Sequence, residues 1–172
     1  MYLYHFSEDS QIEIFHPRKS KSHDHLPPVV WAIDEEHAVN YLFPRDCPRV
    51  IFRRSNNMSK DDEVRFFQDS IADTIITVEN DWLDRIRNTT LFRYTFHNDS
   101  FAMEDRTAGY YISSASVEPI KIDPIHNLLH EIVRRRVELR FTPNLNPIRE
   151  SLLSSTIDDF SIIRFRNAKQ HS

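Results

Sequence analysis

A histidine lies inside the first strand pattern of the chain. The segment YLYHF at 2–6 alternates and is rich in aromatic residues, which predicts a β-strand. An imidazole among aromatic rings is costly to bury unless it is hydrogen-bonded or faces a cleft. His5 is therefore either a core histidine with a satisfied hydrogen bond or a group that contacts a ligand.

A second concentration of polar side chains is the loop FPRDCPR at 43–49. Its two prolines restrict the backbone, so Arg45 is presented with little conformational entropy left to lose. Asp46 could hold this guanidinium in place, and Arg45 or Arg49 could then bind a phosphate through charge-assisted hydrogen bonds. The alternative is that Arg45 and Asp46 only tie the loop down.

Two histidine pairs have spacings compatible with a metal site. His126 and His130 are four residues apart in a segment that predicts a helix, which would place both imidazoles on one face. His23 and His25 form an HxH pattern in a polar loop. Ordinary exposed histidines explain both pairs better than a metal site does, because neither pair has an evident third ligand. We therefore expect no tightly bound metal ion.

The chain contains a single glycine, Gly109. The phosphate-binding loops of P-loop NTPases, Rossmann domains and kinases need several glycines so that the backbone can approach phosphate closely. The sequence excludes these three classes. It also lacks a GxSxG motif, and its lone cysteine, Cys47, lies in a loop without glycine, so a serine-hydrolase or cysteine-protease site is not indicated.

Composition favours one cytoplasmic domain over residues 1–172. Hydrophobic residues make up 40% of the chain, and a chain of this length buries about 70% of its unfolded surface. No apolar run is long enough for a membrane span, no signal peptide pattern is visible, and one cysteine fits a reducing bacterial cytoplasm. The net charge of −4 argues against a general nucleic-acid binder, so a small-molecule or nucleotide ligand is expected.

Strand patterns outnumber helical ones and do not alternate regularly with them. This favours an α+β fold with a mixed, mostly antiparallel β core and about four short helices. Strands are expected at 2–6, 12–15, 28–33, 49–53, 74–78, 91–96, 109–113, 117–122, 137–141 and 160–165, with 109–113 and 117–122 as a hairpin-like pair.

Helices are predicted from capping residues and apolar spacing. Asp34 and Ser59 are expected to cap the segments that follow them, with Val64 and Phe66 or Phe67 turned inward in the second. Asp123 is expected to cap a helix with Pro124 at its first position. Further helices are expected at 81–88 and 147–154, and the arginine run 134–136 would complement the dipole at a helix C-terminus.

The order of the segments LYHFS, VVWAIDEEHAVNYLF and RVIF resembles the ADP-ribosyltransferase fold. The likeness is to the small rifampicin ADP-ribosyltransferase type and, more distantly, to RNA 2′-phosphotransferases, and it covers about residues 1–55. In these families a YHGT-like strand supplies a histidine that grips the ribose of NAD, and a later tyrosine stacks on nicotinamide. The whole chain, including FPRDCPR and the closing FSIIRFRNA, also resembles an uncharacterised bacterial domain family.

The resemblance implies a set of site residues, with two departures. Phe6 replaces the motif glycine, and Trp31 stands in the place of the stacking tyrosine. The implied catalytic residues are His5 and Glu104, with Asp105 as the alternative acidic residue, and the implied NAD-binding residues are Ser7, Trp31, Tyr41 and Arg45.

The resemblance implies cleavage of the nicotinamide–ribose bond of NAD and transfer of ADP-ribose to an acceptor. Positive charge would develop on the ribose, where the carboxylate of Glu104 would stabilise it. Because Phe6 and Trp31 depart from the motif, a non-catalytic nucleotide- or protein-binding module is an alternative. An RNA-end or nucleotide phosphotransferase is a further alternative.

Overall fold

The computed structural model describes residues 1–171. Contacts divide this chain into two compact units, each built around its own β-sheet. The first unit comprises Met1–Leu42 and Thr90–His126, and the second comprises Phe43–Thr89 and the chain from Asn127 onward. The chain combines two mostly antiparallel sheets with short helices, so the predicted α+β class is confirmed.

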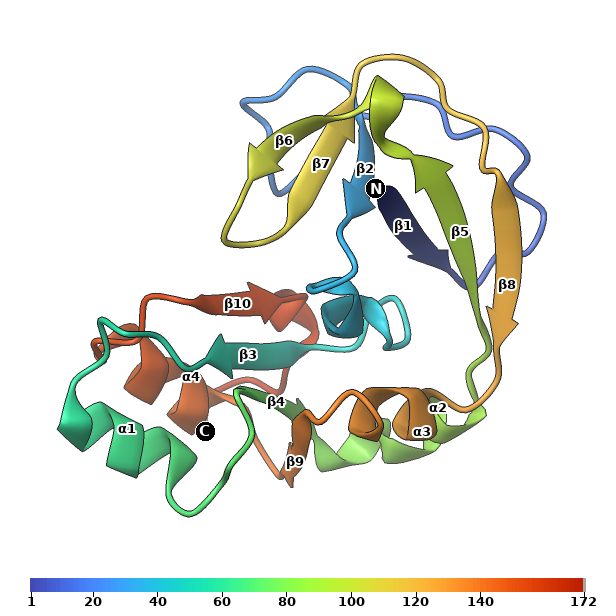
Figure 1. Ribbon diagram of the computed structural model, residues 1–172. Coiled ribbons are helices and arrows are strands. Elements are labelled where there is room, and N and C mark those ends of the chain that lie inside the picture. The colour runs from blue at the N-terminus through green and yellow to red at the C-terminus, as the bar shows by residue number, and fades with distance from the viewer. Residues whose placement is uncertain (172) are drawn as a thin grey trace. The chain divides into compact units, whose positions relative to one another are not determined.

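The first unit is a six-stranded antiparallel sheet with the strand order β6-β7-β2-β1-β5-β8. In Figure 1, β1 in dark blue runs between β2 and β5. The strands are β1 (Tyr2–Ser7), β2 (Val30–Ile33), β5 (Leu91–His97), β6 (Ala102–Asp105), β7 (Tyr110–Ser113) and β8 (Lys121–Ile125), and the unit also holds the 3₁₀ helices η1 (Ala38–Tyr41) and η3 (Asn98–Ser100).

One face of this sheet carries the core of the first unit. The core residues are Leu3, Phe15, Val30, Ala32, Tyr94, Phe96, Tyr111 and Val117. Successive side chains of a strand point to opposite faces, and directly paired residues share a face. Ala32 pairs with Tyr111 on the core face, so Trp31 and Tyr110, one residue away in each strand, lie on the opposite face.

The second unit is a four-stranded sheet with the order β10-β3-β4-β9, in which only β4 and β9 are parallel. Figure 1 shows β10 beside β3, although the two are far apart in the sequence. The strands are β3 (Arg49–Arg53), β4 (Thr74–Glu79), β9 (Glu138–Thr142) and β10 (Phe160–Ile163). The helices are α1 (Lys60–Phe67), α2 (Leu83–Asn88), α3 (Leu128–Val133) and α4 (Asn146–Leu153), with the 3₁₀ helices η2 (Asn80–Trp82) and η4 (Phe165–Asn167).

Helix α1 begins as predicted and packs slightly differently. The Ser59 hydroxyl accepts a hydrogen bond from the Asp62 backbone N–H at 3.1 Å, which is an N-cap. Phe66 and Phe67 are both buried, and each ring lies 5.4 Å from the ring of Phe52. Val64 is 69% exposed, so its predicted inward position is wrong: the two phenylalanines together fill the contact with β3.

The segment after residue 116 is where the sequence prediction fails most clearly. Residues 121–125 form strand β8, paired with β5, so the helix start predicted at Asp123 and Pro124 is wrong. Helix α3 begins later and is capped by Asn127. A proline removes one ladder hydrogen bond donor, which an edge strand tolerates, and β8 is the edge of the sheet.

Three smaller expectations are also corrected. The segments 109–113 and 117–122 do not pair with each other, because β7 pairs with β2 and β6 whereas β8 pairs with β5. The 12–15 strand is reduced to one backbone bridge between Phe15 and Val117. The helix predicted after Asp34 is a turn followed by the short helix η1.

Within residues 1–171, no helix has the length and apolarity needed to cross a membrane.

Candidate functional site

Four aromatic side chains of the first unit form a cluster on the sheet face opposite the core. We call the residues His23, Trp31, Tyr41 and Tyr110 the aromatic surface. The Trp31 ring centroid lies 4.7 Å from that of His23 and 5.6 Å from that of Tyr110. The Tyr41 ring lies 6.3 Å from that of Tyr110. Strands β2 and β7 position two of these rings, while the 16–28 loop and η1 supply the others.

These rings are half-buried, so each keeps part of its surface outside the protein interior. The Tyr41 and Tyr110 hydroxyls share a hydrogen bond of 2.6 Å, which fixes both rings. The indole N–H of Trp31 has no hydrogen-bond acceptor among residues 1–171. Such a surface can stack a flat heteroaromatic ring, and the indole N–H, which lies in the plane of the indole, can donate one hydrogen bond to a ligand group beside that ring.

A carboxylate–imidazole pair, Asp34 and His37, lies between Trp31 and Tyr41 in the sequence. Asp34 follows β2, and its Oδ1 accepts hydrogen bonds from the backbone N–H of His37 at 2.8 Å and from His37 Nδ1 at 2.7 Å. Asp34 therefore acts as a local cap that also orients the imidazole. His37 is buried, with only 6% of its surface exposed.

The only glycine of the chain packs against this pair. Gly109 has φ +70°, in the left-handed region that favours glycine, and its carbonyl accepts the Asp34 backbone N–H at 3.1 Å. A Cβ at this position would overlap the His37 ring and would lie 2.8 Å from Asp34 Oδ1. The absence of a side chain at residue 109 is what lets the imidazole occupy its place.

His5 and Ser7 lie on the core side of the same sheet. His5 pairs with Tyr94 across β1 and β5, and its ring lies 4.9 Å from the ring of Phe15. Its Nδ1 is 3.1 Å from the backbone carbonyl of Trp31, so the two residues meet through the main chain of β2 and not through their rings. The Ser7 hydroxyl accepts the Asp9 backbone N–H at 3.1 Å, closing a turn.

The two acidic candidates, Glu104 and Asp105, lie in β6, which is an edge strand of the sheet. Glu104 is exposed and occupies the bulge between Met103 and Asp105. Asp105 pairs with Tyr110, and its carboxylate accepts the backbone N–H of Ala108 at 3.0 Å. Asp105 is thus the acidic residue beside the aromatic surface in the sheet register, while Glu104 belongs to the irregular part of the strand.

Arg45 belongs to the second unit, in the loop before β3. Its side chain is exposed, and it forms no ion pair with Asp46 within the described part of the chain. The neighbouring Arg49 is buried instead, and its guanidinium donates to the Cys47 carbonyl at 2.7 Å. Burial raises the pKa of the Cys47 thiol to about 12, an effect that outweighs the opposing charge of Arg49, so Cys47 is a protonated core residue.

Neither histidine pair has the arrangement that its spacing suggested for a metal site. His126 precedes α3 and only His130 is inside it, so the predicted common helix face is wrong. His23 and His25 have ring centroids 6.1 Å apart, and His23 Nδ1 is 3.1 Å from the Ser22 hydroxyl. Among residues 1–171, no three histidine, cysteine or acidic side chains are grouped to hold a metal ion.

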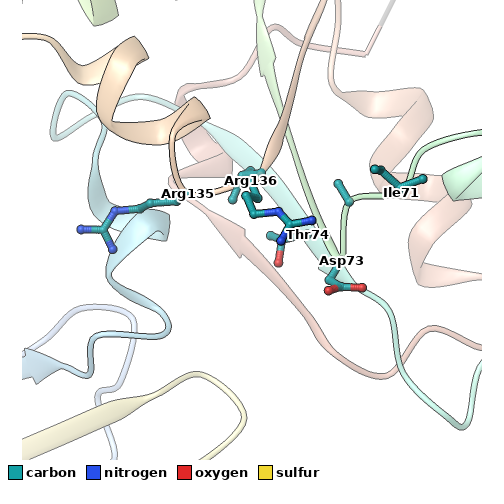
Figure 2. Close-up of a pocket in the computed structure, with 7 residues that line it drawn as sticks. Ile71, Asp73, Thr74, Arg135 and Arg136 are labelled. Atoms are coloured by element: carbon teal, nitrogen blue, oxygen red, sulfur yellow. The ribbon is translucent and has the colours of Figure 1, made fainter.

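A shallow hollow of about 240 Å³ lies elsewhere, in the second unit. Figure 2 shows the Arg136 side chain reaching over Thr74 near Asp73, whereas the Arg135 side chain extends the opposite way. The arginine run follows the end of α3, as predicted, and Arg134 pairs with Glu131 at 2.8 Å. Charges of both signs line this hollow, and none of the candidate site residues lies in it.

The family resemblance implied only two of the six ligand-site residues that the first unit brings together. Trp31 and Tyr41 were implied by the family resemblance, but Tyr110, His23 and the Asp34–His37 pair were not. One signal was available: the only glycine directly precedes an aromatic residue of the sheet, at 109–110. A glycine retained in a chain that otherwise lacks them indicates a backbone site where a side chain cannot fit.

Comparison with known proteins gives one match. No curated protein and no solved structure matches the chain. A family model described as a family of unknown function, DUF6886, matches residues 4–168, which includes both units and every candidate residue discussed above. The chain belongs to the DUF6886 family.

Proposed function

We propose that the first unit binds a nucleotide of the NAD type at the aromatic surface. One observation carries this proposal: the half-buried Trp31 ring contacts both the His23 ring and the Tyr110 ring on the sheet face that does not carry the core. Nucleotide bases stack on aromatic side chains with little dependence on base identity, because every base has a π-face. A fixed indole suits such stacking, and its unused in-plane N–H can donate to a ligand group beside the base.

The resemblance to ADP-ribosyltransferases supports NAD as the ligand. Trp31 and Tyr41 are the two aromatic residues that it assigns to NAD, and both contact Tyr110. Their common neighbour makes them parts of one surface within the first unit. The other NAD-binding residues implied by the resemblance, Ser7 and Arg45, contribute no support, since Ser7 closes a turn and Arg45 belongs to the second unit.

The proposal is for binding and does not extend to ADP-ribosyl transfer. Transfer would need His5 and an acidic residue at the same ligand as Trp31. The His5 ring packs on Phe15 of the core, and its Nδ1 is engaged by a backbone carbonyl. Glu104 lies in a strand bulge with an exposed side chain. A non-catalytic nucleotide-binding module therefore fits these positions better than a transferase.

Tryptophan fluorescence provides a direct test. The chain has two tryptophans, and Trp82 belongs to the second unit, where it contacts Arg85. In a Trp82→Phe variant, emission reports on Trp31 alone. We expect NAD, AMP and nicotinamide mononucleotide each to change this emission in a saturable manner, because a stacked base quenches the indole.

Calorimetry with Trp31→Ala measures how much the indole contributes to the affinity for NAD. Stacking contributes about 1–3 kcal/mol per base, so we expect affinity for NAD to fall about 5- to 150-fold. Trp82→Ala is the matched control, since it removes the same side chain from the other unit and should leave affinity unchanged. Absence of binding by the wild-type protein at millimolar NAD, or equal affinity of Trp31→Ala and wild type, would refute the proposal.

A further inference from the structure

His37 combines deep burial with one unused ring nitrogen. Only 6% of the residue surface is exposed, and Nδ1 is held by the Asp34 carboxylate at 2.7 Å. Because a carboxylate accepts hydrogen bonds, Nδ1 is the ring nitrogen that carries a proton, and whenever the ring holds a single proton Nε2 carries the lone pair. No side chain or backbone group in residues 1–171 is hydrogen-bonded to Nε2.

The small exposed part of the ring includes this nitrogen. Among the described residues Nε2 has no hydrogen-bond partner, and it is not fully enclosed, so it retains access from outside. A nearly buried acceptor without a donor is unfavourable, because it has lost most of its hydration and gained nothing in return. A ligand group that donates a hydrogen bond would satisfy it.

Two neighbours, Asp34 and Gly109, restrict the orientation of the ring. Asp34 Oδ1 binds both the ring and the backbone N–H of His37, so the carboxylate cannot turn away without losing two hydrogen bonds. Gly109 packs against the same Nδ1 edge of the ring, so closely that even a methyl group would overlap it. Nε2 is thus a preorganised acceptor, which lowers the entropic cost of binding a donor.

The pair is attached directly to the aromatic surface through the chain. Gly109 immediately precedes Tyr110, and its carbonyl accepts the Asp34 backbone N–H at 3.1 Å. Tyr41 ends the short helix η1 that begins directly after His37. Two of the four members of the aromatic surface are therefore positioned by the same short segments that position the imidazole.

We propose that His37 Nε2 accepts a hydrogen bond from a sugar hydroxyl of the nucleotide held at the aromatic surface, with Asp34 as its positioning residue. The inference rests on the proposed function and adds a specificity to it. The flat surface stacks any base, whereas an acceptor with a fixed tautomer selects a ligand with a hydroxyl donor. The site would then prefer ribonucleotides to nucleotides that lack sugar hydroxyls.

The test compares AMP with its dideoxy analogue, which lacks both sugar hydroxyls, by isothermal titration calorimetry. We expect the wild-type protein to bind AMP about three- to tenfold more tightly, the effect of one hydrogen bond. In His37→Ala the preference should vanish, with both ligands bound at the affinity of the dideoxy analogue. Asp34→Asn should weaken the preference, because the amide no longer requires a proton on Nδ1.

A spectroscopic measurement guards against variants that fail to fold. Long-range ¹H–¹⁵N correlation spectra of the wild-type protein should show His37 as the Nδ1–H tautomer, and AMP should shift the Nε2 resonance more than the dideoxy analogue does. Equal affinities of wild type for the two nucleotides would overturn this inference and leave the proposed function standing. A preference retained in His37→Ala would also overturn it, and absence of binding by either nucleotide would overturn both.

Discussion

Replacing Gly109 by alanine should destabilise the protein through two separate effects. The φ of +70° at this position costs a residue with a Cβ about 1–2 kcal/mol. The new Cβ would also overlap the His37 ring and approach Asp34 Oδ1 to 2.8 Å, so the ring must leave its place. Alanine gains about 0.4–1 kcal/mol in return, because it restricts the unfolded chain.

The second effect can be estimated from the contact that is lost. The hydrogen bond between His37 Nδ1 and the Asp34 carboxylate, at 2.7 Å, involves a charged acceptor, and such bonds contribute about 1.5–3 kcal/mol. The net loss expected for Gly109→Ala is therefore about 2–4 kcal/mol. Urea unfolding followed by circular dichroism measures it from the midpoint and the slope.

A double-mutant cycle separates the backbone effect from the clash. In a His37→Ala background the ring is absent, so Gly109→Ala should cost only the backbone contribution less the gain from the unfolded chain, about 0–1.5 kcal/mol. The difference between the two backgrounds is the coupling between residues 109 and 37. A single variant within about 0.5 kcal/mol of wild type, or the same cost in both backgrounds, would refute the reasoning.

Two further predictions concern the second unit. Burial raises the pKa of Cys47 to about 12, so a thiol reagent at about pH 8 should label the native protein very slowly and should label one thiol per chain in denaturant; rapid native labelling would contradict this. Asp62 accepts hydrogen bonds from the Thr156 hydroxyl at 2.6 Å and the Thr156 backbone N–H at 2.7 Å, which lower its pKa below the ordinary value of 3.8. The stability that these hydrogen bonds add is present above pH 3.8 and is lost as the pH falls through the lower pKa of Asp62 in the folded protein. Thr156→Val removes the hydroxyl donor, so the variant should lose less stability than wild type between about pH 5 and pH 2. Urea titrations over this pH range measure the difference. An unchanged pH dependence would show that this carboxylate contributes nothing.

Local patterns located most of the elements of the fold. The strands at 2–7, 49–53 and 74–79, and the helix capped by Ser59, follow from alternation, β-branched content and a capping residue. Each of these signals depends on neighbours within a few positions in the sequence. Such signals persist whatever the rest of the chain does.

Sequence patterns failed where two structures compete for the same residues. An aspartate followed by proline predicts a helix start, and Asp123–Pro124 has that pattern, yet both residues lie in β8. The pairing of β8 with β5 decided the outcome, because Phe92 and Pro124 are brought together from 32 positions apart by the sheet. The edge position of β8 then makes the missing proline N–H harmless.

The sequence alone determined the α+β class, the absence of glycine-rich phosphate loops and the residue types available for a ligand. Only the tertiary structure decided which of those residues meet. The register between β1 and β5 turned His5 to the core face, and the register between β2 and β7 placed Trp31 with Tyr110 on the other face. A shift of either register by one residue would move the side chains of a strand to the opposite face. The pairing of β2 with β7 joins residues about 80 positions apart in the chain.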